Sequence, residues 1–376
     1  MTIVHTRPFR RVLVLAAATV LVLGPAGAAS ADLIEGTDGP DVLDGTSRND
    51  TIRGFAGNDV IRGLGGHDRL EGGADDDQLN AGRGYDILDG GLGDDVLQGG
   101  FGPDELYASD PGSDELYGGG QRDALLLEDG ARAIAYGGPG TDQLFMSRGA
   151  TGMLYGEDGD DSLGVWDDSE GELHGGPGSD SFFSDALVGS GGTLMYGGPG
   201  NDFFDISGLA AGVWGGPGND QIILFQCCGS FMTGPVVGGD GDDMLATQDG
   251  NADVVRCGPG QDTARIDLED TVTGCEVIEH RISGDNGDNT LTGTSYNDIF
   301  DGFGGNDVLN GLGGDDTFYP GDGEDTINGD AGDDAVYAWS EVADADTITC
   351  GPGFDTVGAD ALDVVAADCE NVTIYP

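Results

Sequence analysis

The sequence predicts an all-β chain in which very short parallel strands stack into flattened coils, and three observations support this fold class. A nine-residue phrase, with glycine favoured at positions one, two and four, aspartate at position six and a large apolar residue at position eight, repeats without a gap from Gly36 to Gln98. Glycine accounts for 73 of the 376 residues. Acidic residues outnumber basic ones by 70 to 14, and the acids stand in register rather than scattered. A fixed short period of this kind is typical of solenoids, in which each unit packs only against its neighbours.

Each phrase divides into a turn and a strand. Its first six residues favour a tight turn, because glycine adopts positive φ angles at little steric cost. Its last three residues, with one apolar side chain between small or polar ones, suit a very short strand. Two phrases then form a coil of about 18 residues, and successive coils stack about 4.8 Å apart. Phrase n therefore lies directly above phrase n+2, and a thin core receives one large side chain per phrase.

The uninterrupted phrases supply two regular sets of side chains. The apolar residues at position eight are Leu43, Ile52, Ile61, Leu70, Leu79, Leu88 and Leu97. The aspartates at position six are Asp41, Asp50, Asp59, Asp68, Asp77, Asp86 and Asp95.

The spacing of the aspartates predicts metal sites between stacked turns. Bent glycine backbones expose carbonyl oxygens, and the aspartates of vertically adjacent phrases converge between them. Calcium takes about 6–8 hard oxygen ligands at about 2.3–2.6 Å, whereas magnesium demands a tighter octahedron. Zinc favours histidine or cysteine, which do not recur in the phrases. The sequence therefore predicts multiple Ca²⁺ ions as the cofactor.

These phrases resemble the RTX, or haemolysin-type, calcium-binding nonapeptide repeats. The resemblance covers most of residues 34–376. It implies a right-handed parallel β-roll, which is a β-solenoid, with calcium held between turns on both edges. Members of the family often carry a separate enzymatic or toxin domain, and in this chain no segment stands outside the repeats to host one.

The first predicted module spans residues 32–281, and the spacing of its nine-residue phrases changes along its length. Dense repeats occupy 34–126 and include a ten-residue variant, whereas sparse repeats occupy 127–256, where phrase starts lie 18 to 23 residues apart. That distance is one coil rather than half a coil, so calcium turns are expected on one edge only, with plain loops such as 147–152 and 167–171 on the other. The further position-six candidates are Asp104, Asp114, Asp123, Asp142, Asp161, Asp180, Asp202, Asp220 and Asp243.

A second module is expected over residues 282–376, because the chain restarts there with two phrases like those that open the first: Gly284 corresponds to Gly36, and Gly293-Thr294-Ser295 corresponds to Gly45-Thr46-Ser47. Asn289 takes the place of the first aspartate, which weakens that end site. The metal candidates that follow are Asp298, Asp307, Asp316, Asp325 and Asp334.

Both modules finish alike, over residues 257–281 and 350–376. A Cys-Gly-Pro-Gly segment carries a last metal candidate, Asp262 or Asp355, and a second cysteine followed by glutamate comes one coil later. Stacked neighbours about 4.8 Å apart fall within the Cα separation of about 4.4–6.8 Å that a disulfide accepts. Disulfides are therefore predicted between Cys257 and Cys275 and between Cys350 and Cys369, where each would close the open end of a module. The alternative is that these cysteines are free buried thiols.

The adjacent pair Cys227 and Cys228 is left open. It could form a vicinal disulfide with a redox or binding role, an isolated bridge in a loop insertion, or unpaired thiols.

The N-terminus predicts export. Arg7, Arg10 and Arg11 precede an apolar stretch over 12–23, and Ala29-Ser30-Ala31 is a small-residue cleavage site. Residues 1–31 therefore form a Sec signal peptide cleaved after Ala31, and the mature chain is secreted. No later apolar stretch is long enough for a transmembrane segment. The net charge of −56 excludes nucleic acid and anionic membranes as partners.

Sequence motifs of catalysis are absent. The chain has no His-Glu-x-x-His motif and no Gly-x-Ser-x-Gly elbow. Adjacent acids such as Asp94-Asp95 and Asp160-Asp161 suggest glycosidase carboxylates, but catalytic pairs occur once, whereas these recur like structural ligands. We therefore expect no enzyme, and a polysaccharide-active enzyme is the weakest alternative.

The expected function is that of a secreted calcium-binding repeat protein that folds on binding extracellular calcium and has a structural or binding role. A calcium-dependent adhesin or a polysaccharide-binding module is the alternative, with cell-surface or matrix glycans as partners. Aromatic residues beside the sparse turns either form a ladder that binds glycan or cover the edge of the core: Tyr136, Tyr155, Trp166, Tyr196 and Trp214.

Overall fold

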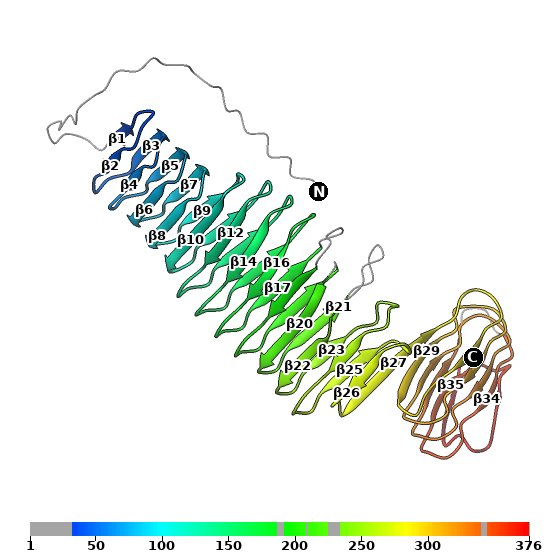
Figure 1. Ribbon diagram of the computed structural model, residues 1–376. Coiled ribbons are helices and arrows are strands. Elements are labelled where there is room, and N and C mark those ends of the chain that lie inside the picture. The colour runs from blue at the N-terminus through cyan, green and yellow to red at the C-terminus, as the bar shows by residue number, and fades with distance from the viewer. Residues whose placement is uncertain (1–31, 186–191, 208–209, 225–233, 340–343, 376) are drawn as a thin grey trace.

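The computed structural model describes residues 32–185, 192–207, 210–224, 234–339 and 344–375. These segments contain 37 strands and no helix, and every strand pairing is parallel. They therefore offer no long apolar helix of the kind that crosses a membrane. Figure 1 shows the strands as a stack of flattened coils running from β1 towards β35. The prediction of an all-β solenoid of the β-roll type is confirmed. The expected signal peptide and the pair Cys227 and Cys228 lie outside the described residues.

One sheet of nineteen strands forms a face of the roll along its full length. It contains β1 (Asp32–Glu35), β3 (Asp50–Ala56), β5 (Arg69–Ala74), β7 (Ile87–Leu92), β9 (Glu105–Ala108), β11 (Ala124–Leu127), β13 (Gln143–Met146), β15 (Ser162–Val165), β17 (Ser181–Ser184), β19 (Phe203–Ile206), β21 (Gln221–Leu224), β23 (Met244–Ala246), β25 (Thr263–Ile266), β27 (Val277–Ser283), β29 (Asn297–Asp301), β31 (Thr317–Tyr319), β33 (Ala335–Ala338), β35 (Thr356–Ala359) and β37 (Asn371–Ile374).

Two further sheets, of thirteen and five strands, form the opposite face. The first contains β2 (Val42–Asp44), β4 (Val60–Arg62), β6 (Gln78–Arg83), β8 (Val96–Phe101), β10 (Ser113–Gly120), β12 (Arg132–Tyr136), β14 (Thr151–Tyr155), β16 (Glu170–His174), β18 (Thr193–Tyr196), β20 (Ala210–Pro217), β22 (Val236–Asp240), β24 (Val254–Arg256) and β26 (Thr271–Thr273). The second contains β28 (Thr290–Thr292), β30 (Val308–Asn310), β32 (Thr326–Asn328), β34 (Thr347–Thr349) and β36 (Val364–Val365).

The strand register places each phrase above the phrase one coil away. Ile52 pairs with Leu70, and Leu70 pairs with Leu88, so apolar positions 18 residues apart stack on one another. Several strands are longer than the predicted three residues, because pairing continues into the glycines of the next turn. For example, Gly73 in β5 still pairs with Gly91 in β7.

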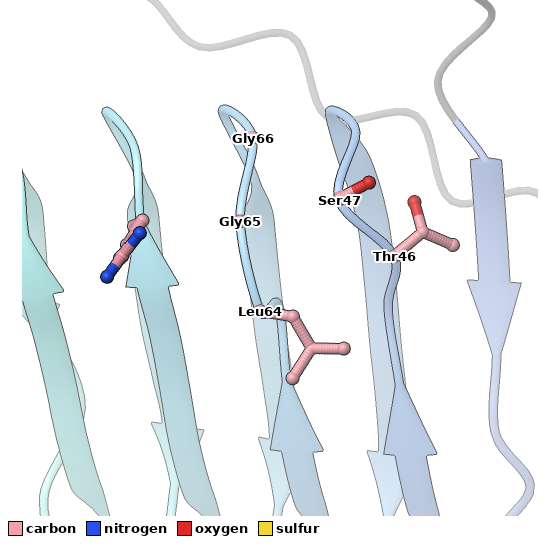
Figure 2. A pocket seen from close by; sticks show the side chains of 6 residues that line it. Thr46, Ser47, Leu64, Gly65 and Gly66 are labelled. Carbon is pink, nitrogen blue, oxygen red and sulfur yellow. The ribbon is translucent and has the colours of Figure 1, made fainter.

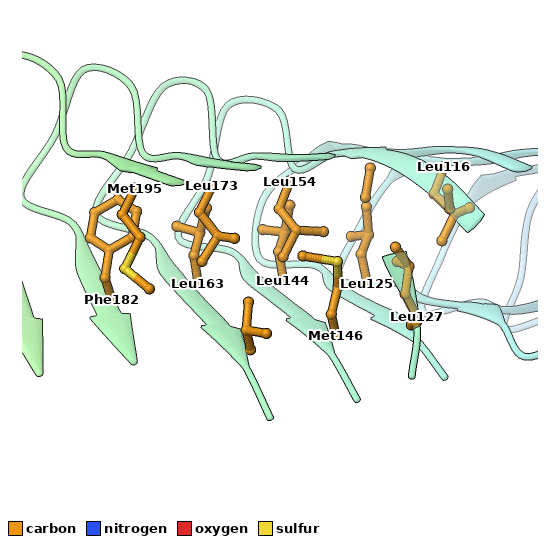
Figure 3. Close-up of a cluster of buried hydrophobic side chains, with 14 of the residues drawn as sticks. Leu116, Leu125, Leu127, Leu144, Met146, Leu154, Leu163, Leu173, Phe182 and Met195 are labelled. Carbon is orange, nitrogen blue, oxygen red and sulfur yellow. The ribbon is translucent and has the colours of Figure 1, made fainter. Parts of the chain in front are cut away.

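The core is a single layer of side chains between the two faces. Figure 3 shows the two rows meeting along the sparse part of the roll. All of the following are fully buried, the first four coming from the even-numbered strands and the last four from the odd-numbered ones: Leu116, Leu154, Leu173, Met195, Leu125, Leu144, Leu163 and Phe182. In the dense region one large side chain per strand holds the sheets together, as predicted. In the sparse region several odd-numbered strands bury two, such as Leu125 with Leu127 in β11 and Leu144 with Met146 in β13.

Two buried clusters divide the core near the predicted module boundary. The first ends with the partly buried Ile278, and the second begins with Ile282. β27 pairs with both β25 and β29, so the nineteen-stranded sheet crosses the boundary while the opposite face is interrupted. The division into two modules, 32–281 and 282–376, stays a prediction.

The plain loops of the sparse region are shorter than predicted. β14 begins at Thr151 and β16 begins at Glu170, so the last residues of both expected loops belong to strands. A tight turn precedes each strand, and in the first of them Arg148 and Gly149 both have positive φ angles. Compact turns suffice because the two sheets are separated by one layer of side chains.

Candidate metal centres

The position-six aspartates form continuous columns along the edges of the roll. In each column the backbone N–H of one aspartate donates to Oδ1 of the aspartate one coil later. The distance is 2.8 Å from Asp59 to Asp77 and from Asp77 to Asp95. It is 2.7 Å from Asp142 to Asp161, in the sparse region. The turns are thus locked to one another through their carboxylates.

All 23 aspartates predicted as metal ligands lie in these columns. The first column, on the edge that leads into the odd-numbered strands, contains Asp50, Asp68, Asp86, Asp104, Asp123, Asp142, Asp161, Asp180, Asp202, Asp220, Asp243 and Asp262. The second column, on the other edge, contains Asp41, Asp59, Asp77, Asp95 and Asp114. In the second module the corresponding columns contain Asp298, Asp316, Asp334 and Asp355, and Asp307 and Asp325.

The columns explain why the nine-residue phrases are spaced more widely in the sparse region than in the dense region. Beyond Asp114 only the first column continues through the described part of the sparse region, as the spacing of the phrases predicts. The first column is also interrupted between the modules. There Oδ1 of Asp298 lies 3.1 Å from Nδ1 of the buried His280, which stands one coil earlier in the place of an aspartate.

The second carboxylate oxygen of most column members is buried and has no hydrogen-bond partner. This holds for Oδ2 of Asp59, Asp68, Asp77, Asp86, Asp95, Asp104, Asp123, Asp142, Asp161, Asp180, Asp202, Asp220, Asp243, Asp262, Asp307, Asp316, Asp325, Asp334 and Asp355. A buried carboxylate oxygen without a partner is costly unless a cation or a proton satisfies it. The columns are therefore rows of unsatisfied carboxylate oxygens, which are hard ligands for a metal ion.

Backbone carbonyl oxygens lie beside these carboxylates. A Cβ built on Gly54 would lie 2.1 Å from Oδ2 of Asp59 and 2.6 Å from the carbonyl oxygen of Gly72, one coil further on. Gly63 stands in the same relation to Asp68 and to the carbonyl oxygen of Ala81. Glycine at position one keeps this space clear, and the mixture of carboxylate and carbonyl oxygens fits calcium.

The predicted metal sites are not built from clustered side chains alone. In the described segments no group of three His, Cys, Asp or Glu side chains could hold a metal ion by itself. A site between turns instead needs backbone oxygens to complete its shell. This is the reason for the strict glycine pattern around each aspartate.

Burial, in many cases with repulsion from neighbouring carboxylates, raises the pKa values of most column carboxyls. Burial, reinforced by Asp142 and Asp104, raises the pKa of Asp123 to about 8, although the N–H of Asp104 opposes the shift. Burial likewise raises the pKa of Asp316 to about 8 and that of Asp77 to about 7. Without a cation these carboxyls therefore retain protons close to neutral pH. A divalent cation between the turns would replace those protons.

The carboxylates at the N-terminal ends of the columns accept hydrogen bonds from nearby threonines. Thr37 donates its backbone N–H to Oδ2 of Asp41, at 2.6 Å, and its hydroxyl to the same oxygen, at 2.9 Å. Thr46 does the same for Asp50. In the second module Thr294 donates its backbone N–H to Oδ2 of Asp298 in the same way. The threonines near the start of each module therefore satisfy terminal carboxylates, a role that sequence reasoning did not assign.

Sequence reasoning also missed the residues at the far ends of the columns. The N–H of Asp262 donates to Oε2 of Glu276 at 3.0 Å, and the N–H of Asp355 donates to Oε2 of Glu370 at 3.0 Å. Asp346 extends the column after Asp325, although it lies outside any nine-residue phrase. The sequence signal that could have identified the two glutamates is their repeated position, because each directly follows the second cysteine of its module.

Both predicted disulfides are present. The Cα atoms are 5.1 Å apart in Cys257–Cys275 and 5.2 Å apart in Cys350–Cys369. Each bridge joins neighbouring coils at the C-terminal end of its module.

Removal of the first bridge by Cys257→Ala with Cys275→Ala is expected to destabilise the end of the first module by about 3 kcal/mol, because the bridge closes a loop of about one coil. Thermal unfolding in saturating calcium measures the effect, with the Cys350→Ala and Cys369→Ala pair as the matched comparison. Unchanged unfolding in both double variants would contradict this role.

The aromatic residues form a stack on the outer face of the thirteen-stranded sheet. Ring centroids of successive members are 4.7 to 5.1 Å apart and the rings are nearly parallel, in the order Tyr117, Tyr136, Tyr155, His174, Tyr196 and Trp214. Trp166 instead packs against Phe145 on the other sheet. The ladder therefore exists, but each internal ring has both faces covered by its neighbours. A sugar platform needs free ring faces, so this geometry favours a stabilising role, and the rings stack outside the core rather than covering its edge.

Tyr155→Ala is expected to destabilise the sparse region by about 1–3 kcal/mol, because it removes two ring contacts worth about 0.5–1.5 kcal/mol each. Tyr155→Phe retains the ring and serves as the control. Chemical unfolding in saturating calcium measures both variants. Equal stability of the alanine and phenylalanine variants would show that the stack contributes nothing.

A shallow pocket opens on the edge of the dense region between successive turns (Figure 2). Its lining is Thr46, Ser47, Leu64, Gly65, Gly66 and Arg83. These residues supply no carboxylate, histidine or cysteine to act as a general base, so the pocket does not resemble a catalytic site.

A comparison with known protein families identifies the same repeats that carry the aspartate columns. The RTX calcium-binding nonapeptide repeat matches residues 35–70, 71–106, 89–125, 283–318 and 319–340. No curated protein matches the chain. The matched segments include the aspartate columns of the dense region and, in the second module, every column aspartate from Asp298 to Asp334. The chain therefore carries RTX calcium-binding nonapeptide repeats, stacked as a β-roll, in both parts of its length.

Proposed function

We propose that the protein is secreted, folds when it binds extracellular calcium, and then serves as a rigid structural or binding module. The observation that carries this proposal is the row of buried, unpartnered Oδ2 atoms beside backbone carbonyl oxygens. Each such oxygen needs a positive partner, and the predicted ligands are the 23 column aspartates. Calcium supplies that partner for many turns at once.

The charge balance supports the same proposal. A net charge of −56 disfavours a compact chain without counter-ions. Arginines do not neutralise the columns: Arg53 pairs with Glu71 and Arg148 with Asp129, all outside them. Among the ion pairs of the described segments, only His280 with Asp298 includes a column member. Multivalent cations therefore have to do most of the neutralisation.

The proposed location follows from the predicted signal peptide and from the repeats, because RTX repeat proteins are usually extracellular. Extracellular calcium sites work at about 10⁻⁴–10⁻³ M, so they fill outside the cell. Because binding free energy then becomes folding free energy, the chain is exported unfolded and orders afterwards. A β-roll of this kind is typically non-catalytic, and we propose no enzymatic activity.

Calcium titration of the full mature chain tests the proposal. At neutral pH the metal-free chain is expected to lose most of its far-UV β signal, and millimolar calcium is expected to restore it with many ions bound per chain. Asp161→Asn keeps the acceptor for the N–H of Asp142 but removes the charge of a buried carboxylate, so it should bind fewer ions.

Asp168→Asn is the matched control, because Asp168 is exposed in a loop of the same coil and its replacement removes the same charge. Its ion count should equal that of the unmodified chain. Equal β content in excess chelator and in millimolar calcium would contradict calcium-coupled folding.

A further inference from the structure

The two edges of the dense region differ in the charge of their turns. The turns that lead into the first column span residues 46–49, 64–67, 82–85, 100–103 and 119–122, and this row of turns is termed the basic edge. None of these turn residues is acidic, although the chain contains 70 acidic residues. The turns of the opposite edge, in contrast, carry the exposed Asp38, Asp75, Asp76 and Asp94. One edge of the roll is therefore free of acids outside its buried column.

Cations and apolar side chains alternate along the basic edge. Arg48 lies in its first turn, Arg83 in its third and Arg122 in its fifth, and all three are exposed. Because coils stack about 4.8 Å apart, the turns that carry successive arginines are about 10 Å apart. The second and fourth turns carry the exposed Leu64 and Phe101. A regular row of cations with apolar contacts between them results.

The three arginines are not neutralised by the protein itself. None of the ion pairs in the described segments includes Arg48, Arg83 or Arg122. The guanidinium carbon of Arg83 lies 5.9 Å from the centroid of the Phe101 ring. This cation–π contact orients the guanidinium but leaves its charge and its hydrogen-bond donors available.

The shallow pocket shown in Figure 2 opens on the basic edge. Arg83 lines it together with Thr46, Ser47 and Leu64. A guanidinium forms paired hydrogen bonds with a carboxylate, and side-chain hydroxyls donate to and accept from other hydroxyls. This mixture of a cation, hydroxyls and an apolar side chain fits a sugar that carries a carboxylate.

The other titratable groups beside these turns are already engaged. Glu105, which directly follows the turn at 100–103 and Asp104, accepts hydrogen bonds from the hydroxyls of Tyr85 and Tyr107. Nδ1 of His67 accepts the N–H of Tyr85 at 2.8 Å, so the ring carries its proton on Nε2 and is neutral. The positive charge of the basic edge therefore comes from its arginines.

Calcium in the first column would add to that charge. Each column aspartate borders the gap on either side of its turn, as Asp68 does between Asp50 and Asp86, so each gap has one carboxylate charge on average. A divalent cation in every gap then leaves an excess of about one positive charge per coil. On the opposite edge the exposed aspartates cancel this excess. Calcium loading thus makes the basic edge positive in a chain whose net charge is −56.

We infer that the basic edge of the calcium-loaded protein binds an acidic polysaccharide, which lies along the axis of the roll. The arginines pair with its carboxylates, and the apolar side chains between them contact the faces of its sugar rings. The inference rests on the proposed function, because calcium gives the edge its sign. It adds the class of partner and the surface that holds it.

The spacing of the arginines favours a polysaccharide over a nucleic acid. A nucleic-acid strand carries one charge per about 3.4 Å, which is about three phosphates for each step between successive arginines. Most of those phosphates would meet no cation on a chain that is otherwise strongly acidic. A polysaccharide with one carboxylate per disaccharide has fewer charges, and its uncharged sugars suit the turns that carry Leu64 and Phe101.

Isothermal titration calorimetry of the full mature chain in millimolar calcium tests the inference, with hyaluronan oligosaccharides, which carry one carboxylate per disaccharide, as the probe. The unmodified chain is expected to bind this probe, and to bind a neutral chito-oligosaccharide of the same length far more weakly. Arg83→Gln is expected to weaken hyaluronan binding about 2- to 5-fold, and combined glutamine substitution of Arg48, Arg83 and Arg122 about 10-fold or more.

Arg132→Gln is the matched control, because Arg132 is exposed at the start of β12, outside the basic edge, and its replacement removes the same charge. It should leave hyaluronan affinity unchanged, and all variants should keep the far-UV spectrum and the calcium count of the unmodified chain.

A calcium-loaded chain that binds no hyaluronan, or binds it equally well in the triple variant and in Arg132→Gln, would overturn the inference and leave the proposed function intact. Tighter binding of single-stranded DNA than of hyaluronan would overturn the choice of a polysaccharide. Absence of bound calcium from the unmodified chain would overturn both the inference and the proposed function.

Discussion

In calcium-free solution the chain is expected to hold more β structure at about pH 5 than at about pH 8, the reverse of the behaviour expected with calcium. The physical reason is the raised pKa of most column carboxyls, which reaches about 8 for Asp123 and about 7 for Asp104 and Asp180. Burial is the largest cause in each case. The same carboxyls titrate near their ordinary value of 3.8 in the unfolded chain.

The sign of the pH dependence follows from proton linkage. The folded chain binds more protons than the unfolded chain between about pH 4 and pH 8, so its stability falls as the pH rises through this window. Protons then substitute for calcium in the columns at acidic pH. Calcium binding must displace those protons, so calcium affinity is expected to rise from about pH 6 to pH 8.

Far-UV circular dichroism of chain freed of metal on a chelating resin measures the effect, with sedimentation velocity at each pH to detect association. The same series in millimolar calcium is the control and should show full β content at about pH 8. A metal-free chain whose β content rises with pH across this range would contradict the assignment of protons to the columns.

Gly66→Ala is expected to destabilise the dense repeats strongly, whereas Gly65→Ala, one residue earlier, is expected to be tolerated. Gly66 has a φ of +128°, and a Cβ there would lie 2.3 Å from the carbonyl carbon of Arg48 in the coil below. A Cβ on Gly65 would meet nothing closer than 3.5 Å, at the carbonyl oxygen of Arg83.

The expected cost at Gly66 combines a left-handed backbone, about 1–2 kcal/mol, with forced separation of two coils, about 1–3 kcal/mol. Because a solenoid is stabilised by nearest-neighbour contacts, the effect should remain local. Hydrogen exchange in saturating calcium should show faster exchange around β3 and β5 in Gly66→Ala and little change around β33. Equal exchange in the two variants would show that the turn has room for a side chain.

The aspartate columns and the clasps follow from the sequence because they depend on period alone. Residues 18 or 19 positions apart come into register in a coil of that length, which brings Asp59 to Asp77 and Cys257 to Cys275. The same arithmetic predicts a single column in the sparse region. Local glycine content then decides where the turns lie, with no knowledge of distant contacts.

Other features depend on what the fold places beside each turn. The contacts of Thr37 with Asp41 and of Asp262 with Glu276 span 4 and 14 residues, so the one-coil period does not predict them. The same is true of the buried, unpartnered Oδ2 atoms of Asp253 and Asp360, which lie outside the nine-residue phrases.

The sequence by itself thus determined the repeating unit, its stacking, the bridged cysteines and the preference for calcium, because each is a property of one short phrase and its period. Only the tertiary structure decided which carboxylate oxygens stay unsatisfied, how the columns end and whether the aromatic rings expose their faces. Those outcomes depend on burial and on contacts between irregular loops of unequal length, and a periodic pattern contains no information about either.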